Sequence, residues 1–251
     1  MFSRVKQIIG WWALGALMLG PWPAAWGQGT VRGQVLLIDH AKKHIRNDNA
    51  NVVLWLTPKT QPVPHSALLR DFRTGGALRL VQRNKAFHPH ILVVPAGAVV
   101  NFPNRDPFFH NVFSLFEGQR FDLGLYEAGT SRRVHFDRPG ISYIFCNIHA
   151  QMSAVVIALD TPYYAISRKS GDFNIPEVPP GSYELQVWYE GSTADVLKTL
   201  TRTITIPETG VSLAAIQVVE NTSLMPHKNK YGHDYDPGTY DPLYQQQQND
   251  K

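Results

Sequence analysis

Short segments in which apolar and polar residues alternate fill most of this 251-residue chain, and glycine or proline separates many of them. Because successive side chains of a strand point to opposite faces, a period of two predicts β-strands. No stretch shows the apolar spacing of a long amphipathic helix. The sequence therefore predicts an all-β fold of packed sheets. Expected strands cover 30–40, 50–58, 77–81, 90–94, 99–102, 111–114, 131–136, 141–145, 154–159 and 183–189, with others around Phe173, in 199–207 and in 211–220.

Residues 1–27 are predicted to be a secretory signal peptide. Arg4 and Lys6 precede an apolar run at 8–19, and prolines close the run before small residues near position 27. The alternative is an uncleaved anchor, but the run is shorter than the ~20 residues that a membrane span needs. Cleavage would remove two positive charges from the formal net charge of +4, so the mature chain gives no indication of nucleic-acid binding. We expect an exported, periplasmic bacterial protein without a membrane span.

The only cysteine of the chain, Cys146, lies in the segment YIFCNIHAQM, which also contains His149 and Met152. A lone cysteine cannot form an internal disulfide, so in an exported chain it is buried, reactive or bound to metal. Thiolate, imidazole and thioether together suit a metal that alternates between Cu(II) and Cu(I). A trigonal copper site needs one more histidine, and His110, in NRDPFFHNVFS, is the candidate.

Other chemistries fit these residues less well. Structural zinc sites prefer four cysteine or histidine ligands and rarely use a thioether. Catalysis by a cysteine–histidine pair lacks a third orienting residue and an oxyanion motif, so we expect no enzymatic activity. The attachment motif for c-type haem is absent from the sequence. The plainest alternative is a buried cysteine, two hydrogen-bonded histidines and a core methionine, without any metal.

The segments AFHPHILVVPAGAVVNFPNRDPFFHNVFS and YIFCNIHAQM together resemble the cupredoxin family over residues 77–160. The Cys-x2-His-x2-Met spacing is more similar to amicyanin and pseudoazurin than to plastocyanin. The resemblance implies a Greek-key β-sandwich that holds one type 1 copper. It makes His110, Cys146 and His149 the equatorial ligands and Met152 the weak axial ligand. It also implies that Asn111 links the two ligand segments and influences the thiolate; the alternative is a polar residue at a strand edge.

The same resemblance implies a one-electron carrier that transforms no substrate. In cupredoxins, the histidine of the ligand loop reaches the surface through an apolar patch where redox partners dock. His149 is therefore the expected electron port, and Phe108, Phe109, Ile148 and Ala150 are its apolar neighbours in sequence. The implied partners are redox proteins such as a periplasmic dehydrogenase or a cytochrome c.

The segment SGDFNIPEVPPGSYELQVWYEG resembles the later strands of carboxypeptidase regulatory-like, or transthyretin-like, sandwiches. The opening strands of such domains resemble VRGQVLLID and ANVVLWLTP, near the start of this chain. We therefore expect a discontinuous domain, 30–75 with 161–221, into which the cupredoxin domain is inserted. The alternative is one extended cupredoxin sandwich with extra strands. Residues 222–251 are predicted to be a flexible tail, and the order of parts resembles exported proteins of the methylamine-utilisation type.

Two further functions stay open at this point. The first is a copper chaperone or buffer, which would add His88 and His90, or His227 and His233 of the tail, to the ligands above. The second is a glycan- or partner-binding sandwich in which copper is ancillary. Its candidate contact residues are the aromatic residues Trp55, Trp188 and Tyr189.

Overall fold

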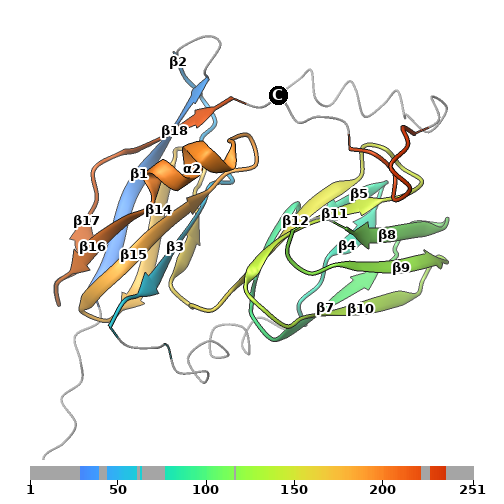
Figure 1. Ribbon diagram of the computed structural model, residues 1–251, viewed down its shortest axis with the longest axis horizontal. Helices are drawn as coiled ribbons and strands as arrows, with labels where there is room; N and C mark the ends of the chain where they lie inside the picture. The colour runs from blue at the N-terminus through green and yellow to red at the C-terminus, as the bar shows by residue number, and fades with distance from the viewer. Residues whose placement is uncertain are drawn as a thin grey trace, which may run out of the picture.

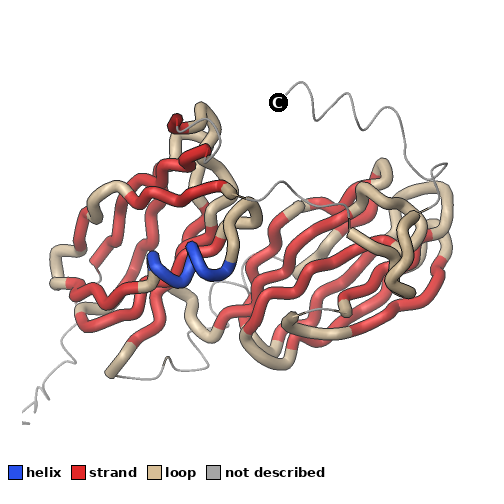
Figure 2. The backbone as a smooth tube through the Cα atoms, turned by 45° about the horizontal axis from the view of Figure 1, so that its top comes forward, coloured by secondary structure: helices blue, strands red, loops and turns tan. Residues whose placement is uncertain are grey.

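The computed structural model describes residues 29–39, 44–60, 63, 77–115, 117–221 and 227–235. The predicted signal peptide and most of the connection at 61–76 lie outside the described residues. The described chain consists of β-strands and one short helix, α2 (Ala194–Leu200), drawn in blue in Figure 2. The predicted all-β fold is therefore confirmed. No helix among the described residues is long and apolar enough to cross a bilayer.

The first strand group is built from two segments that are far apart in sequence (Figure 1). In one sheet, β1 pairs antiparallel with β14 and β2, and parallel with β17 and β18. The other sheet has the order β13–β3–β15–β16. The strands of this group are β1 (Gly29–Asp39), β2 (His44–Ile45), β3 (Val53–Pro58), β13 (Tyr164–Ile166), β14 (Asp172–Val178), β15 (Gly181–Trp188), β16 (Arg202–Ile206), β17 (Val211–Ser212) and β18 (Ile216–Glu220).

The central strand group contains all strands between β3 and β13. Its larger sheet has the order β6–β12–β11–β8–β9, and the smaller pairs are β10–β7 and β4–β5. Isolated bridges from Arg79 to Asn101 and from Gln82 to Asn104 connect the β4 segment to β7. The strands are β4 (Val81–Arg83), β5 (Ala86–His88), β6 (Ile91–Pro95), β7 (Ala98–Pro103), β8 (His110–Ser114), β9 (Phe121–Tyr126), β10 (Ser131–Phe136), β11 (Gly140–Cys146) and β12 (Ser153–Leu159).

Strand β12 is buried on both of its faces. Ala154 and Val156 belong to the core of the central group. Val155 and Ile157, which point the opposite way, belong to the core of the first group. This double burial explains why SAVVIAL is apolar almost throughout instead of alternating. The two strand groups, side by side in Figures 1 and 2, are thus joined by a continuous apolar contact.

Among the elements that were not predicted from the sequence are β4, β5, β9 and α2. Strand β9 contains Gly124 at positive φ, and its burial does not alternate regularly, so it lacks the strand signature. Strands β4 and β5 have three residues each and form a hairpin, too short for a period to be recognised. Helix α2 has seven residues and buries only Leu197, so its sequence shows no apolar stripe.

Candidate metal centre

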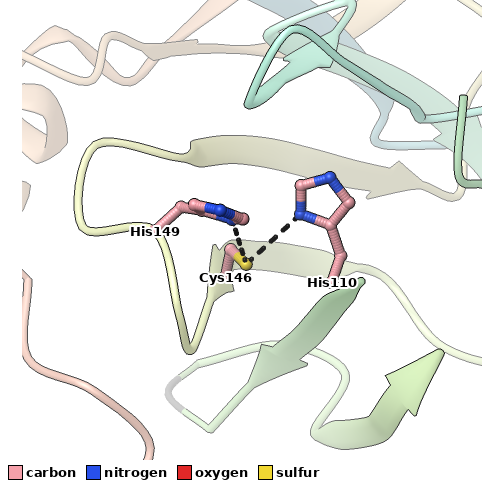
Figure 3. Close-up of side chains that lie close together, drawn as sticks. All are labelled: His110, Cys146 and His149. Atoms are coloured by element: carbon pink, nitrogen blue, oxygen red, sulfur yellow. Dashed lines mark hydrogen bonds between the residues drawn. The ribbon is translucent and has the colours of Figure 1, made fainter. Parts of the chain in front are cut away.

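The fold brings two distant ligand segments together at one end of the central group. His110 is the first residue of β8 and Cys146 the last residue of β11, and these strands pair antiparallel. His149 lies on the loop between β11 and β12. Cys146 Sγ is 3.6 Å from Nδ1 of His110 and 3.5 Å from Nδ1 of His149. Figure 3 shows both imidazole rings turned toward the sulfur.

The three donor atoms are spaced as the ligands of one metal ion would be. They lie within 4.8 Å of one another, and the three residues form the only such group of His, Cys, Asp or Glu among the described residues. Bonds of about 2.0–2.3 Å at roughly 120° would place a thiolate sulfur about 3.8 Å from an imidazole nitrogen. The observed separations are close to that value, so the residues fit a trigonal metal site.

Met152 is held by the same loop as His149. Its backbone N–H donates to the His149 carbonyl at 3.1 Å, and its own carbonyl accepts from the Cys146 N–H at 3.1 Å. The Met152 side chain is fully buried in the core cluster that also contains Cys146. One tight turn therefore fixes three of the four predicted ligand residues relative to each other.

The environment of Cys146 has two opposing effects on its acidity. Burial raises the pKa of the thiol, because a thiolate loses its hydration there. Backbone N–H groups of Ile148, Asn111 and His149 act in the opposite direction by donating toward the sulfur. Burial is the larger effect, so the pKa of the thiol is raised, and a thiolate here needs a nearby positive charge such as a bound metal cation.

Both histidines favour the neutral form that a metal ligand requires. Burial, together with the nearby His110 and Lys85, lowers the pKa of His149 to about 4, although Asp106 acts in the opposite direction. Burial also lowers the pKa of His110, although Asp106 partly opposes this effect. At neutral pH the nitrogen lone pairs therefore remain available.

We expect the metal-free protein to lose stability as the pH falls from about 6.5 to about 4. Because the pKa of His149 is lowered on folding, the unfolded chain binds the proton more readily, so the free energy of unfolding rises with pH over this window. The loss on acidification is about 2–3 kcal/mol, since the ring is partly solvated. Urea denaturation at pH 7, 5.5 and 4 measures it. The His149→Gln variant should show a flatter profile, and an equal slope in both proteins would contradict the expectation.

Asn111 connects the two ligand segments through its backbone. Its carbonyl accepts from the Asn147 N–H at 2.8 Å, and its N–H faces the Cys146 sulfur. The Asn111 side chain instead donates to Asp122 Oδ1 at 2.8 Å. The resemblance implied that Asn111 links the two predicted ligand segments. The contacts of Asn111 that connect these segments are made by its backbone, whereas its side chain contacts Asp122.

An apolar side chain covers the two imidazole rings. The Phe108 ring lies 5.4 Å from the His110 ring and 5.5 Å from the His149 ring, measured between centroids. Phe109, next to it, is 50% exposed, whereas Ile148 is half-buried against the central core. His110 is fully buried and His149 is partly exposed. Of the two rings, His149 is therefore the one that reaches the surface.

Residues 227–235, here called the C-terminal strap, pack against the ligand loop (red in Figure 1). The Tyr235 hydroxyl donates to the Cys146 carbonyl at 2.7 Å, and the Lys230 N–H donates to Asn147 Oδ1 at 2.9 Å. The His227 ring stacks 4.1 Å from that of Phe145. These contacts connect residues 227–235, which lie in the predicted flexible tail, to the segment that contains Cys146 and Asn147. Residues 222–226 and 236–251 lie outside the described residues.

The additional histidines do not gather around a second metal position. His88 Nε2 contacts the Arg83 carbonyl, and His90 contacts the Ser153 carbonyl and Glu190. His227 contacts Tyr235, and His233 is exposed. None of the four belongs to the group of three described above.

Sequence reasoning missed Asp106, which contacts a predicted ligand. Its Oδ2 lies 2.9 Å from Nε2 of His110, and both side chains are buried. The available signal was the acidic residue four positions before the histidine in NRDPFFH. Because carboxylates are common in loops, that spacing alone did not distinguish Asp106 from a solvated residue.

Comparisons with known proteins give structural likenesses only. No family model and no curated protein matches the chain. A purple cupredoxin from Nitrosopumilus maritimus is similar at 20% identity and a TM-score of 0.31, covering 33% of this chain and 99% of the other. An amicyanin mutant in its reduced Cu(I) form is similar at 18% identity and a TM-score of 0.32, covering 45% and 100%.

A copper-containing nitrite reductase (NirK) from Thermus scotoductus is also similar, at 21% identity and a TM-score of 0.32. The likeness covers 39% of this chain but only 25% of the reductase. At such TM-scores, the case for a function has to come from the contacts of the site itself.

Proposed function

We propose that this protein is a type 1 copper protein that carries single electrons between redox partners. The observation that carries the proposal is the meeting of His110, Cys146 and His149, from segments far apart in sequence, at separations suited to one metal. Copper held by these residues and Met152 would supply reversible one-electron chemistry. The protein itself contributes a water-excluding core, two neutral imidazoles and a ligand loop that a strap restrains.

The exposure of His149 supports electron transfer over copper handling and glycan binding. The partly exposed His149, whose ring lies 5.5 Å from that of Phe108, offers a short route from the buried sulfur to a docked protein. We propose a periplasmic redox protein, such as a dehydrogenase or cytochrome c, as the partner and no catalysed reaction for this chain. Copper handling would gain support from a second ligand group, which the described histidines do not form. A glycan platform on Trp188 is disfavoured because that side chain is 3% exposed.

We also propose a division into domains. The pairing of β1 with β14 and β18 supports a discontinuous carboxypeptidase regulatory-like sandwich made from 30–75 and 161–221. Residues 77–160 then form an inserted cupredoxin domain with its own core. We also propose an exported location, which the predicted signal peptide at 1–27 supports.

Spectroscopy of the copper-loaded protein tests the proposed function. The mature chain, loaded with one equivalent of Cu(II), should show an intense thiolate-to-copper absorption band and an EPR spectrum with a small hyperfine splitting. Both features should disappear on reduction and return on oxidation. A colourless protein, or a tetragonal EPR signal, would overturn the assignment. Binding of several copper ions that a chelator readily removes would favour the copper-handling function.

Replacing Met152 with leucine should raise the reduction potential while the colour remains. The change removes a weak sulfur donor that favours Cu(II), and it nearly conserves the buried volume, so the cost in stability should stay below about 1.5 kcal/mol. Spectroelectrochemical titration measures the potential. The matched control is Ile144→Leu, a volume-conserving change in the same core. Equal potentials in the two variants would exclude Met152 from the ligand set.

A further inference from the structure

The carboxylate of Asp106 is built into the structure by several independent contacts. Its Oδ1 accepts the Asn84 N–H at 2.5 Å, and its Oδ2 accepts the Lys85 N–H at 3.0 Å. The Asp106 N–H donates to Asn104 Oδ1 at 3.0 Å. The side chain is only 4% exposed, and the remaining contact of Oδ2 is the 2.9 Å approach to His110. The carboxylate is therefore held in place before any metal is considered.

The hairpin of β4 and β5 supplies the two backbone donors. Its two-residue turn consists of Asn84 and Lys85, which have φ values of 56° and 55°. Positive φ at both central positions is typical of a type I′ turn, and asparagine tolerates it well. In this conformation, both turn N–H groups point at Asp106. The turn of the hairpin therefore holds the carboxylate in place through two backbone hydrogen bonds.

The contact with Asp106 determines which nitrogen of His110 can bind a metal. A carboxylate accepts hydrogen bonds, so Nε2 carries the proton and donates it to Oδ2. Nδ1 then has a free lone pair, and it is this atom that lies 3.6 Å from the Cys146 sulfur. His149 Nδ1 also faces the sulfur, but among the described residues no carboxylate makes a hydrogen bond with the His149 ring. The two ligand imidazoles therefore differ in charge environment.

We propose that Asp106 is a positioning residue that fixes His110 as an Nδ1 ligand and lowers the reduction potential of the bound copper. This inference rests on the proposed function. A fixed negative charge one imidazole away from the metal makes the ring a stronger donor and favours the more highly charged Cu(II) over Cu(I). The effect is large because both side chains are buried, where solvent screens their interaction weakly.

The test compares Asp106→Asn with Asp122→Asn, another variant that loses one negative charge near the site. Asp122 contacts Asn111 and Lys230 rather than a ligand ring. Asp106→Asn should keep the blue band, weaken Cu(II) binding by about 10- to 100-fold, and change the Cu(II)/Cu(I) equilibrium by about tenfold, or ~59 mV upward. Asp122→Asn should produce a much smaller change. Equal potentials in both variants would overturn the proposal.

A second measurement needs no copper. Long-range proton–nitrogen NMR of the metal-free protein at neutral pH should show the Nε2–H tautomer at His110. In Asp106→Ala the Nε2–H preference should weaken, while His149 keeps its signals. An unchanged tautomer in a folded Asp106→Ala protein contradicts the positioning role. Wild-type protein could lack the blue band and still show an Nε2–H tautomer at His110 that weakens in Asp106→Ala. That result would contradict the electron-carrier function and support the positioning role of Asp106.

Discussion

Replacing Cys146 with serine is expected to abolish the intense visible absorption of the copper-loaded protein completely. The band arises from charge transfer between a thiolate and Cu(II), and a serine hydroxyl offers no comparable donor. Serine is slightly smaller than cysteine, and its oxygen meets the backbone N–H groups of Asn111 and Ile148 that otherwise face the sulfur. The chain should therefore fold, at a cost of about 1–3 kcal/mol for the buried hydroxyl.

Absorption and EPR spectra of wild type and variant, recorded at equal copper content, measure this outcome. The Met152→Leu protein is the control, because it alters the ligand loop and keeps the thiolate. Any copper retained by Cys146→Ser should give a tetragonal EPR signal. A variant that stays as blue as the parent would show that the sulfur of Cys146 does not bind the metal.

Replacing Val155 with alanine is expected to destabilise the whole protein by about 2–3 kcal/mol, through lost burial and a residual cavity. Val155 is 0% exposed and lies in β12, on the face that packs into the core of the first strand group. The matched control is Val99→Ala on β7, because Val99 is 47% exposed and its truncation should cost less than about 0.5 kcal/mol.

Chemical denaturation followed by tryptophan fluorescence and by circular dichroism measures both variants. Because β12 serves two cores, the two probes should report one coincident transition in the parent protein. Equal stabilities of the two variants would contradict the double burial of β12. Two separate transitions in the parent would show instead that the strand groups unfold independently.

The grouping of His110, Cys146 and His149 could be predicted from sequence because the residue types are rare and their combined chemistry is specific. Cys146 is the only cysteine, and His149 and Met152 follow it at spacings that one turn can close. The pairing of β8 with β11 then brings in His110, a long-range step for which the resemblance, rather than any local pattern, provided the expectation. Alternating strands were predictable for a similar reason, since one face of each is buried.

The features that were missed depend on contacts with no local signature. The role of Asp106 depends on a hairpin of two three-residue strands, too short for a recognisable period, whose turn directs two N–H groups at the carboxylate. The C-terminal strap is polar, and its order comes from contacts such as that of Tyr235 with Cys146, 89 residues away. Propensity and periodicity describe neighbours along the chain, so they carry no information on such pairs.

The double burial of β12 bears on how the metal centre can be isolated for study. A fragment cut at residues 77 and 160 would keep His110, Cys146, His149 and Met152, yet it would present the outward side chains of β6 and β12 to water. An apolar strip of this kind promotes self-association. It would also lack the strap that restrains the ligand loop. A soluble minimal fragment that contains the candidate metal site will therefore need polar replacements at Val155 and Ile157 and a tethered copy of residues 227–235.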